Sequence, residues 1–255
     1  MEYVRGRIAR ACQRCGRDPS TVTLVAVTKG VDAPAIREAI ALGLRDLGEN
    51  RVQEARRKRE TMEVRNAEWG MRSFTDSEFR TPNSELPSAL SPVKWHLIGH
   101  LQRNKAKEAV ELFAVIHSLD TTALAEALER HAAATDKEVE VFIQVNVSGE
   151  ATKFGCAPDE AQALAKTVMQ LPHLRLRGLM TIAPFADDRE TIRPIFHQLR
   201  GLRDELQVAV VNRRTGEPAN RPTQWLLSMG MSQDFETAIG EGADVIRVGT
   251  AIFGT

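Results

Sequence analysis

Hydrophobic and polar positions follow two alternating patterns along the chain. Short runs rich in β-branched residues, typical of strands, are followed by longer segments whose apolar residues recur at helical spacing, as Leu124, Ala127 and Leu128 do. The expected strands are Val22–Thr28, Leu44–Gly48, Trp95–Ile98, Val115–Leu119, Glu138–Val147, Leu174–Ile182, Trp225–Met229 and Ala243–Val248.

This order of elements predicts an α/β fold, a single parallel (β/α)8 TIM barrel. A helix is expected after every strand, with only the last strand left open, and an extra amphipathic helix is expected at Glu2–Gly16. An open doubly wound sheet is the alternative. Eight sequential βα units in 255 residues fit closure better, so residues 1–255 are expected to form one domain.

Two segments, 62–94 and 211–223, break the alternation. The first is rich in Ser, Pro, Asn and charge, and we expect it to be a mobile surface insertion. The helix before it is expected from Asn50 to about Glu60. Its basic run, 56–59, is interpreted as a solvated helix face.

Charge and composition narrow the class of protein. Lys plus Arg and Asp plus Glu both total 34, and this zero net charge does not favour nucleic-acid binding. Apolar runs such as Val141–Val147 are far below the roughly 20 residues that span a bilayer. Residues 1–10 lack the apolar region of a secretory signal, and three cysteines build no disulfide framework, so a cytoplasmic protein is expected.

Functional groups of such barrels lie at the carboxyl ends of the strands. Lys29 ends the first strand and shares a face with Val25 and Val27. If that face points inward, desolvation would lower the pKa of the lysine and free its amine to attack a carbonyl. The alternative is a lysine at a strand end that simply reaches water.

A second group of residues, after the seventh and eighth strands, is suited to an anion. Ser232 is placed to cap a helix, and Gly249 and Thr250 offer close backbone approach, a hydroxyl and an N–H. Arg247 is expected to point inward and to need a ligand or a carboxylate. The alternatives are an ordinary N-cap, an ordinary turn glycine and a structural salt bridge.

The sequence predicts no metal site. His96 and His100 are four residues apart, but on a strand and a loop, without the glutamate of a metalloprotease motif. Cys12 and Cys15 form a lone CxxC, interpreted as two thiols at the solvent edge because no second pair accompanies them.

Six blocks of sequence, in order, resemble the pyridoxal 5′-phosphate (PLP) homeostasis family (the YggS/PROSC type). The six together are specific, although no single one would suffice. They are Val25–Lys29, Gly48–Glu54, Trp95–Gln102, Gly178–Ile182, Ser228–Asp234 and Arg247–Gly254. The insertion at 62–94 is longer than that family leads us to expect.

The resemblance implies the fold of the N-terminal barrel of alanine racemase (PLP fold type III). It implies that Lys29 holds PLP as a Schiff base and that Arg247 lies near the pyridine nitrogen. The phosphate would be bound by Ser232, Gly249 and Thr250, and the pocket lined by Asn50, His96 and Met229.

The resemblance also implies a PLP carrier or regulator of vitamin B6 and amino-acid balance, with apo PLP-dependent enzymes as candidate partners. A low-activity amino-acid racemase is the first alternative, and a sugar-phosphate barrel enzyme with a lysine base is the second. The racemase's tyrosine base and second domain find no counterpart, since Tyr3 is the only tyrosine. Without that second domain, a monomer is expected.

The expected arginine gives a physical reason for weak catalysis. A guanidinium only donates hydrogen bonds, so Arg247 would favour the unprotonated pyridine ring, a poorer electron sink. Alanine racemase works with an arginine at this place, so activity would be lowered without being excluded.

Overall fold

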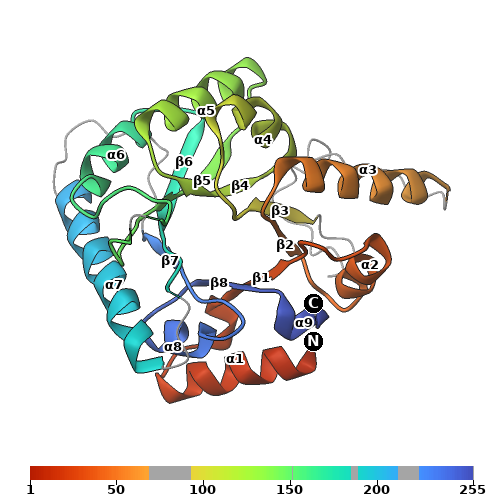
Figure 1. Ribbon diagram of the computed structural model, residues 1–255, viewed down its shortest axis with the longest axis horizontal. Helices are drawn as coiled ribbons and strands as arrows, with labels where there is room; N and C mark the ends of the chain where they lie inside the picture. The colour runs from red at the N-terminus through yellow and green to blue at the C-terminus, as the bar shows by residue number, and fades with distance from the viewer. Residues whose placement is uncertain (69–92, 151, 185–188, 212–223, 255) are drawn as a thin grey trace, which may run out of the picture.

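Eight parallel strands close into a barrel in the order in which they follow one another along the chain (Figure 1). The computed structural model describes residues 1–68, 93–150, 152–184, 189–211 and 224–254. The strands are β1 (Thr23–Val27), β2 (Asp46–Glu49), β3 (Lys94–Leu97), β4 (Val115–Leu119), β5 (Val139–Gln144), β6 (Leu174–Met180), β7 (Leu226–Ser228) and β8 (Val245–Val248).

The helices surround this barrel (Figure 1). Because β1 pairs with β8, with Thr23 opposite Val245, the predicted closure is confirmed and the open sheet is excluded. A short helix also follows the last strand, which the sequence left open. The helices are α1 (Glu2–Arg14), α2 (Ala33–Ala41), α3 (Val52–Glu68), α4 (Ala106–Leu112), α5 (Thr122–Ala134), α6 (Ala161–Val168), α7 (Arg189–Val211), α8 (Phe235–Gly240) and α9 (Thr250–Phe253).

The boundary of α3 differs from the prediction. This helix runs to Glu68, so the first residues of the expected insertion are helical. Six of the nine residues at 60–68 are Glu, Met, Arg or Ala, all good helix formers, and they extend the helix without an apolar period. At the other end of the expected insertion, Lys94 already belongs to β3, and Val211, the first residue of the second irregular segment, ends α7. Apart from Val93, the remainder of the two segments, residues 69–92 and 212–223, lies outside the described residues.

Side chains fill the barrel and the layer around it as two cores. The interior core contains Val25, Val115, Phe142, Met180 and Val245. The larger core lies between strands and helices and includes residues that alternate with these along the strands. Since the interior is packed, as in other barrels of this type, chemistry is confined to the ends of the strands.

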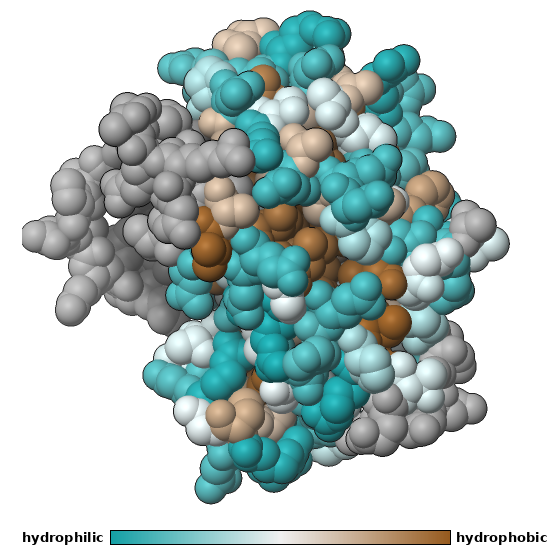
Figure 2. Space-filling view, turned by 90° about the vertical axis from the view of Figure 1, so that its left-hand side faces the viewer, coloured by the Kyte–Doolittle hydropathy of each residue, from teal (hydrophilic) through white to brown (hydrophobic). Residues whose placement is uncertain are grey.

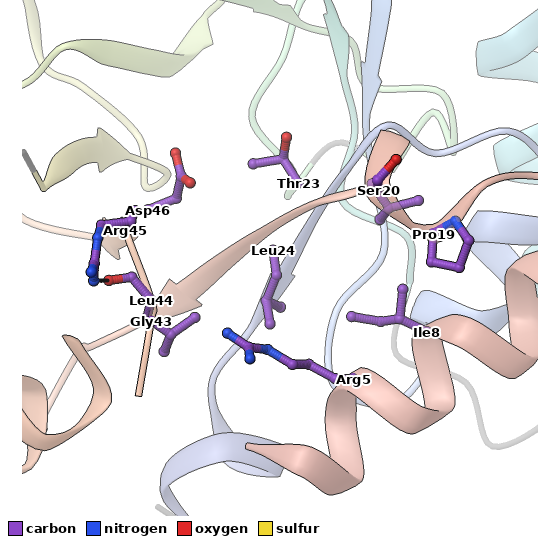
Figure 3. Close-up of a pocket in the computed structure, with 11 residues that line it drawn as sticks. Arg5, Ile8, Pro19, Ser20, Thr23, Leu24, Gly43, Leu44, Arg45 and Asp46 are labelled. Carbon is purple, nitrogen blue, oxygen red and sulfur yellow. Dashed lines mark hydrogen bonds between the residues drawn. The ribbon is translucent and has the colours of Figure 1, made fainter. Parts of the chain in front are cut away.

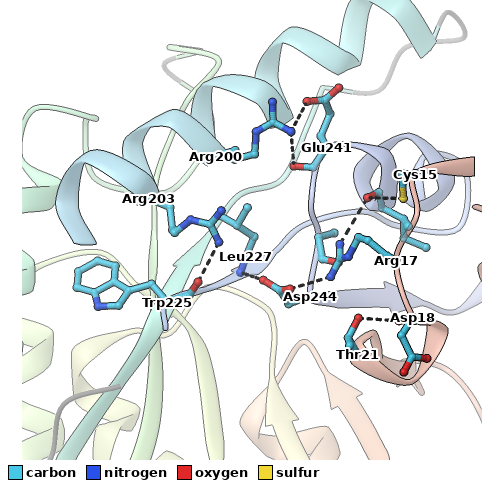
Figure 4. A network of polar contacts seen from close by, with 12 residues as sticks. Cys15, Arg17, Asp18, Thr21, Arg200, Arg203, Trp225, Leu227, Glu241 and Asp244 are labelled. Carbon is cyan, nitrogen blue, oxygen red and sulfur yellow. Dashed lines mark hydrogen bonds and ion pairs between the residues drawn. The ribbon is translucent and has the colours of Figure 1, made fainter. Parts of the chain in front are cut away.

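A polar network joins α1 to the amino-terminal ends of β7 and β8 (Figure 4). Arg17 donates to Asp244 at 2.9 Å and to the carbonyl of Ala243 at 2.7 Å, and Asp244 accepts from the backbone N–H of Leu227 at 2.9 Å. Burial raises the pKa of Asp244, and these hydrogen bonds oppose that shift. The extra N-terminal helix is thereby anchored to the amino-terminal end of the barrel.

A cleft of about 510 Å³ opens at that same end, between α1 and the starts of β1 and β2 (Figure 3). Arg5, Leu24 and Asp46 are among the residues that line it. Asp46 is therefore accessible at the end of the barrel opposite Lys29.

The outer surface is mostly hydrophilic on the side shown in Figure 2, where hydrophobic residues gather in a band across the middle. The described residues include no helix with the length and apolar character that crossing a membrane requires. The large hydrophobic side chains that are exposed within the described chain lie far apart in the sequence: Tyr3, Leu42, Phe154, Ile182 and Val208.

Candidate functional site

Lys29 follows β1 in a turn and is exposed, next to the fully buried Thr28. The face of β1 that contains Val25 does point into the barrel, as expected. The burial on which the expected desolvation of Lys29 depended is absent, because the strand ends at Val27 and the lysine lies beyond the packed interior. Its amine is accessible at the carboxyl end of the barrel.

A buried ionic cluster lies beneath this turn. Lys58 donates to Glu49 and Glu54 at 2.7 Å each and to the carbonyl of Thr28. The interpretation of residues 56–59 as a solvated helix face is therefore wrong for Lys58, which is 5% exposed. The four basic residues span about one helical turn, and Lys58 is the one that faces the barrel, where Glu49 supplies its counter-charge.

The same cluster holds the backbone on both sides of Lys29. The carbonyl of Thr28 accepts from Lys58, and Glu54 accepts from the N–H of Gly30 at 2.7 Å. Burial raises the pKa of Glu49, against the opposing hydrogen bonds from Lys58 and Thr28. Lys29 is thus an exposed amine on a rigidly supported turn.

Ser232 contacts a different helix from the one expected. Helix α8 begins only at Phe235, with Asp234 at the N-cap position, and the side chain of Asp234 accepts from the N–H of Met231. Ser232 is turned toward the loop after β8, where its Oγ accepts from the N–H groups of Gly249 at 3.2 Å and of Ala251 at 3.5 Å. The two strand ends therefore meet through the serine hydroxyl.

Gly249 lies between that hydroxyl and the end of β1. A Cβ at this position would lie 3.2 Å from both the Cβ and the carbonyl oxygen of Val27, so only glycine fits without displacing its neighbours. Thr250, which is exposed, begins α9 directly after it. One edge of the barrel thus contains backbone N–H groups, the hydroxyls of Ser232 and Thr250, and the turn with Lys29.

Arg247 points into the barrel, as expected from its alternation with Val245. Its guanidinium donates to Ser228 Oγ at 2.6 Å and to the carbonyl of Thr181 at 2.8 Å. Burial lowers the pKa of Arg247 to about 10, with Asp234 acting in the opposite direction. Burial also raises the pKa of Asp234. At neutral pH the arginine is a buried cation held by neutral oxygen acceptors.

His96 lies inside the barrel with both ring nitrogens engaged. Nε2 is 2.9 Å from Asp46 Oδ1 and Nδ1 is 2.9 Å from Nε2 of His117, whose Nδ1 is 2.8 Å from Ser228 Oγ. Burial is the main cause that lowers the pKa of His117 well below its usual value, and the positive charges of Arg247 and Lys94, with any on His96, act in the same direction. His117 is therefore neutral at physiological pH.

This shift predicts a pH dependence of stability. Below 6.5 the unfolded chain binds a proton at His117 that the folded chain does not bind, so stability is present above 6.5 and lost as the pH falls. The slope from this group is about 1.4 kcal/mol per pH unit. Urea unfolding from pH 7 to pH 5 should show a smaller slope for His117→Phe than for wild type. Identical slopes would contradict the assignment, since the groups that face His117 are the same in both proteins.

The other expected residues are placed as follows. Asn50 is half-buried directly after β2, and Met229 is fully buried in the larger core. Cys12 is also fully buried, so the expectation of two solvent-edge thiols holds only for Cys15. Within the described ranges, no group of three or more His, Cys, Asp or Glu side chains could hold a metal ion.

The donors at this end suit a phosphorylated aldehyde. An exposed primary amine can condense with a carbonyl, and the hydroxyl and N–H groups of Ser232, Gly249 and Ala251 can surround an anion. Arg247 supplies a buried donor for an aromatic nitrogen. These chemical requirements are those of PLP.

The model of the alanine racemase N-terminal domain family matches residues 4–255, and the chain belongs to this family. It is 42% identical over 251 residues to the pyridoxal phosphate homeostasis protein of Pseudomonas aeruginosa, covering 98% of this chain and 92% of that one. The protein of the same name from Aquifex aeolicus is 38% identical, and the match covers 100% of this chain and 96% of that one. The resemblance seen in the six sequence blocks is confirmed.

Solved structures support the same placement. PipY of Synechococcus elongatus, with PLP bound, is 36% identical with a TM-score of 0.71, over 97% of this chain and all of that one. An alanine racemase of Clostridium difficile is 12% identical with a TM-score of 0.64, over 99% of this chain and 56% of the racemase. That likeness shows the shared barrel fold.

Sequence reasoning missed the partners that hold these groups. His117 lies in β4 two residues after the inward Val115, so a polar residue on an interior face was the available signal. Lys58 and Glu49 carried no such signal, because nothing in the sequence places one beside the other.

Proposed function

We propose that this chain binds PLP through a Schiff base between Lys29 Nζ and the aldehyde of the cofactor. In this proposal the phosphate is bound by Ser232, Gly249 and Thr250, and Arg247 faces the pyridine nitrogen. The observation that carries it is the meeting of Ser232 Oγ with the N–H groups after β8, the strand that pairs with β1, which leads into the turn at Lys29.

The role that fits these groups best is PLP homeostasis, in which the cofactor is held and passed on rather than used for turnover. A Schiff base supplies reversible covalent binding when PLP is present. Arg247 cannot accept a proton from the pyridine ring and so favours the less reactive, unprotonated ring. The pyridoxal phosphate homeostasis proteins named above support this role, and vitamin B6 and amino-acid balance would be its physiological setting.

A low-activity racemase is the competing proposal. Its tyrosine base would have to come from Tyr3, which is on α1 and 67% exposed, with the guanidinium of Arg7 over its ring at 5.6 Å. The likeness to racemases extends to the fold alone, so the carrier is the function we propose. Asn50, His96 and Met229 remain proposed parts of the pocket or of its support.

Replacing Lys29 tests the proposal directly. Wild-type protein incubated with PLP should show the visible absorbance of a Schiff base, removed by borohydride, and mass spectrometry should locate the reduced adduct at Lys29. Lys29→Ala should lose the reducible absorbance completely, because no other amine is proposed at the aldehyde. Lys166→Ala, at an exposed lysine on α6, is the matched control and should behave as wild type. An adduct on another lysine would contradict the assignment.

A transfer assay separates carrier from enzyme. The loaded protein should restore activity to an apo PLP-dependent enzyme and show no turnover on a panel of D- and L-amino acids. Rapid racemisation would overturn the carrier. The proposal extends to a cytoplasmic monomer whose partners are apo PLP-dependent enzymes, which size-exclusion chromatography and cell fractionation would check.

A further inference from the structure

Five side chains form one hydrogen-bonded chain across the interior of the barrel. It begins at Asp46 on β2, passes through His96 on β3 and His117 on β4, and continues to Ser228 on β7 and Arg247 on β8. The four donor–acceptor distances lie between 2.6 and 2.9 Å. Asp46 lines the cleft at the amino-terminal end, whereas Arg247 belongs to the proposed PLP site (Figure 3).

The two ends of this chain are compatible with a single direction of donation along it. A guanidinium only donates and a carboxylate only accepts. Arg247 Nη1 therefore donates to Ser228 Oγ. When the serine hydroxyl in turn donates to His117 Nδ1, the same direction continues toward Asp46. His117 Nε2–H then donates to His96 Nδ1, and His96 Nε2–H donates to Asp46. In this arrangement the serine hydroxyl and each ring N–H donate once, and each ring carries its proton on Nε2.

The surroundings of His117 favour the same state. Its side chain is fully buried and its ring stacks on Phe142, with centroids 4.7 Å apart and planes at 15°. A second proton on this ring would place a further positive charge beside Arg247 and reverse the hydrogen bond from Ser228. The serine hydroxyl would then have to find another acceptor in the packed interior.

We propose that His117 is a positioning residue for Arg247 and acts on it through Ser228. By accepting the serine proton, His117 directs the serine lone pairs toward Nη1, while the carbonyl of Thr181 holds Nη2. The chain ends on a group that cannot accept a proton, so it orients Arg247 rather than delivering a proton to it. This inference rests on the proposed function, in which Arg247 faces the pyridine nitrogen.

The test combines two variants of His117 with two readouts. His117→Phe keeps a ring to stack on Phe142 and removes both hydrogen bonds, whereas His117→Asn keeps a polar group near the position of Nδ1. His173→Phe is the control, since His173 pairs with Glu129 outside the barrel interior, at 2.8 Å. The first readout is ¹⁵N NMR of the histidine rings and of the Arg247 guanidinium without PLP. The second is the affinity for PLP itself.

Wild type should show His117 as the neutral Nε2–H tautomer at pH 7. In His117→Phe the guanidinium protons of Arg247 should exchange at least about tenfold faster, and PLP affinity should fall about tenfold, the usual effect of one lost hydrogen bond. His117→Asn should recover part of both effects, and the control should show neither. If His117→Phe does not fold, Ser228→Ala supplies the same comparison with the His117 ring in place.

The outcomes are distinguishable. A charged His117, an Nδ1–H tautomer, or unchanged Arg247 exchange in both His117→Phe and Ser228→Ala would overturn the positioning role. If wild type binds no PLP, the proposed function fails, and the NMR readout still decides whether His117 orders Arg247.

Discussion

Gly178→Ala should destabilise the protein by more than about 3 kcal/mol, the range of severe backbone and packing defects. A Cβ at Gly178 would lie 1.9 Å from the carbonyl oxygen and 2.6 Å from the nitrogen of Leu226, both backbone atoms of β7. The residue also has a φ of +152° at a register shift between β5 and β6. Neither the clash nor the backbone conformation can be relieved without moving a barrel strand.

Urea unfolding at pH 7 is the measurement, with Gly201→Ala as the control. Gly201 lies on α7, where an added Cβ would have no neighbouring atom within 4 Å, so alanine there should stabilise the protein by about 0.5–1 kcal/mol. A wild-type midpoint for Gly178→Ala would show that β6 and β7 do not approach as closely as described. Opposite signs for the two substitutions are the expected result.

Lys58→Met should cost about 3–5 kcal/mol, because it leaves a buried carboxylate without its cation. Glu49 is fully buried, and its Oε2 has no hydrogen-bond partner in the described structure. Methionine has a similar length and preserves packing, so the loss reports the charge. Support for the turn at Lys29 would weaken with it, and Schiff-base formation should slow in the variant.

The double variant Lys58→Met/Glu49→Gln separates charge from packing. It should regain much of the lost stability, because the amide can be buried without ionisation. Lys107→Met, at an exposed lysine on α4, should change stability by less than about 0.5 kcal/mol. If the single and double variants are equally unstable, the defect lies in packing rather than in the uncompensated charge of Glu49.

Local rules predicted most of the fold. The start of α2 shows such a rule at work: Asp32 at the N-cap accepts from the N–H of Ala35 at 3.1 Å, with Pro34 in the first turn. Helix α3 was predicted too short. Its last residues are helical through helix propensity alone, in a segment without an apolar period, and periodicity does not detect such a segment. Strand ends shifted by a few residues, as for β2, because pairing with neighbours rather than composition sets where a strand stops.

The candidate site was predicted less evenly. Arg247 was expected to point inward, since two-residue alternation from Val245 fixes the face of a strand. Ser232 was assigned to the wrong helix, because a serine hydroxyl can accept from either of two nearby sets of N–H groups. In the structure Asp234 has the N-cap position of α8, and Ser232 accepts from the N–H groups of Gly249 and Ala251 instead.

Periodicity and residue type along the chain were sufficient for the barrel, for its strand order and for the edge at which Lys29, Ser232 and Gly249 meet. They were insufficient for the partners of those residues. His117 and Ser228 are 111 positions apart, and Lys58 on α3 donates to the carbonyl of Thr28 directly after β1. An alternating pattern determines which face a side chain occupies, but closure of the barrel determines which faces come together and at what register. Pairing of β1 with β2 and packing of α3 place the exposed lysine on a buried ionic cluster, and closure of the barrel places an arginine at the end of a chain of hydrogen bonds.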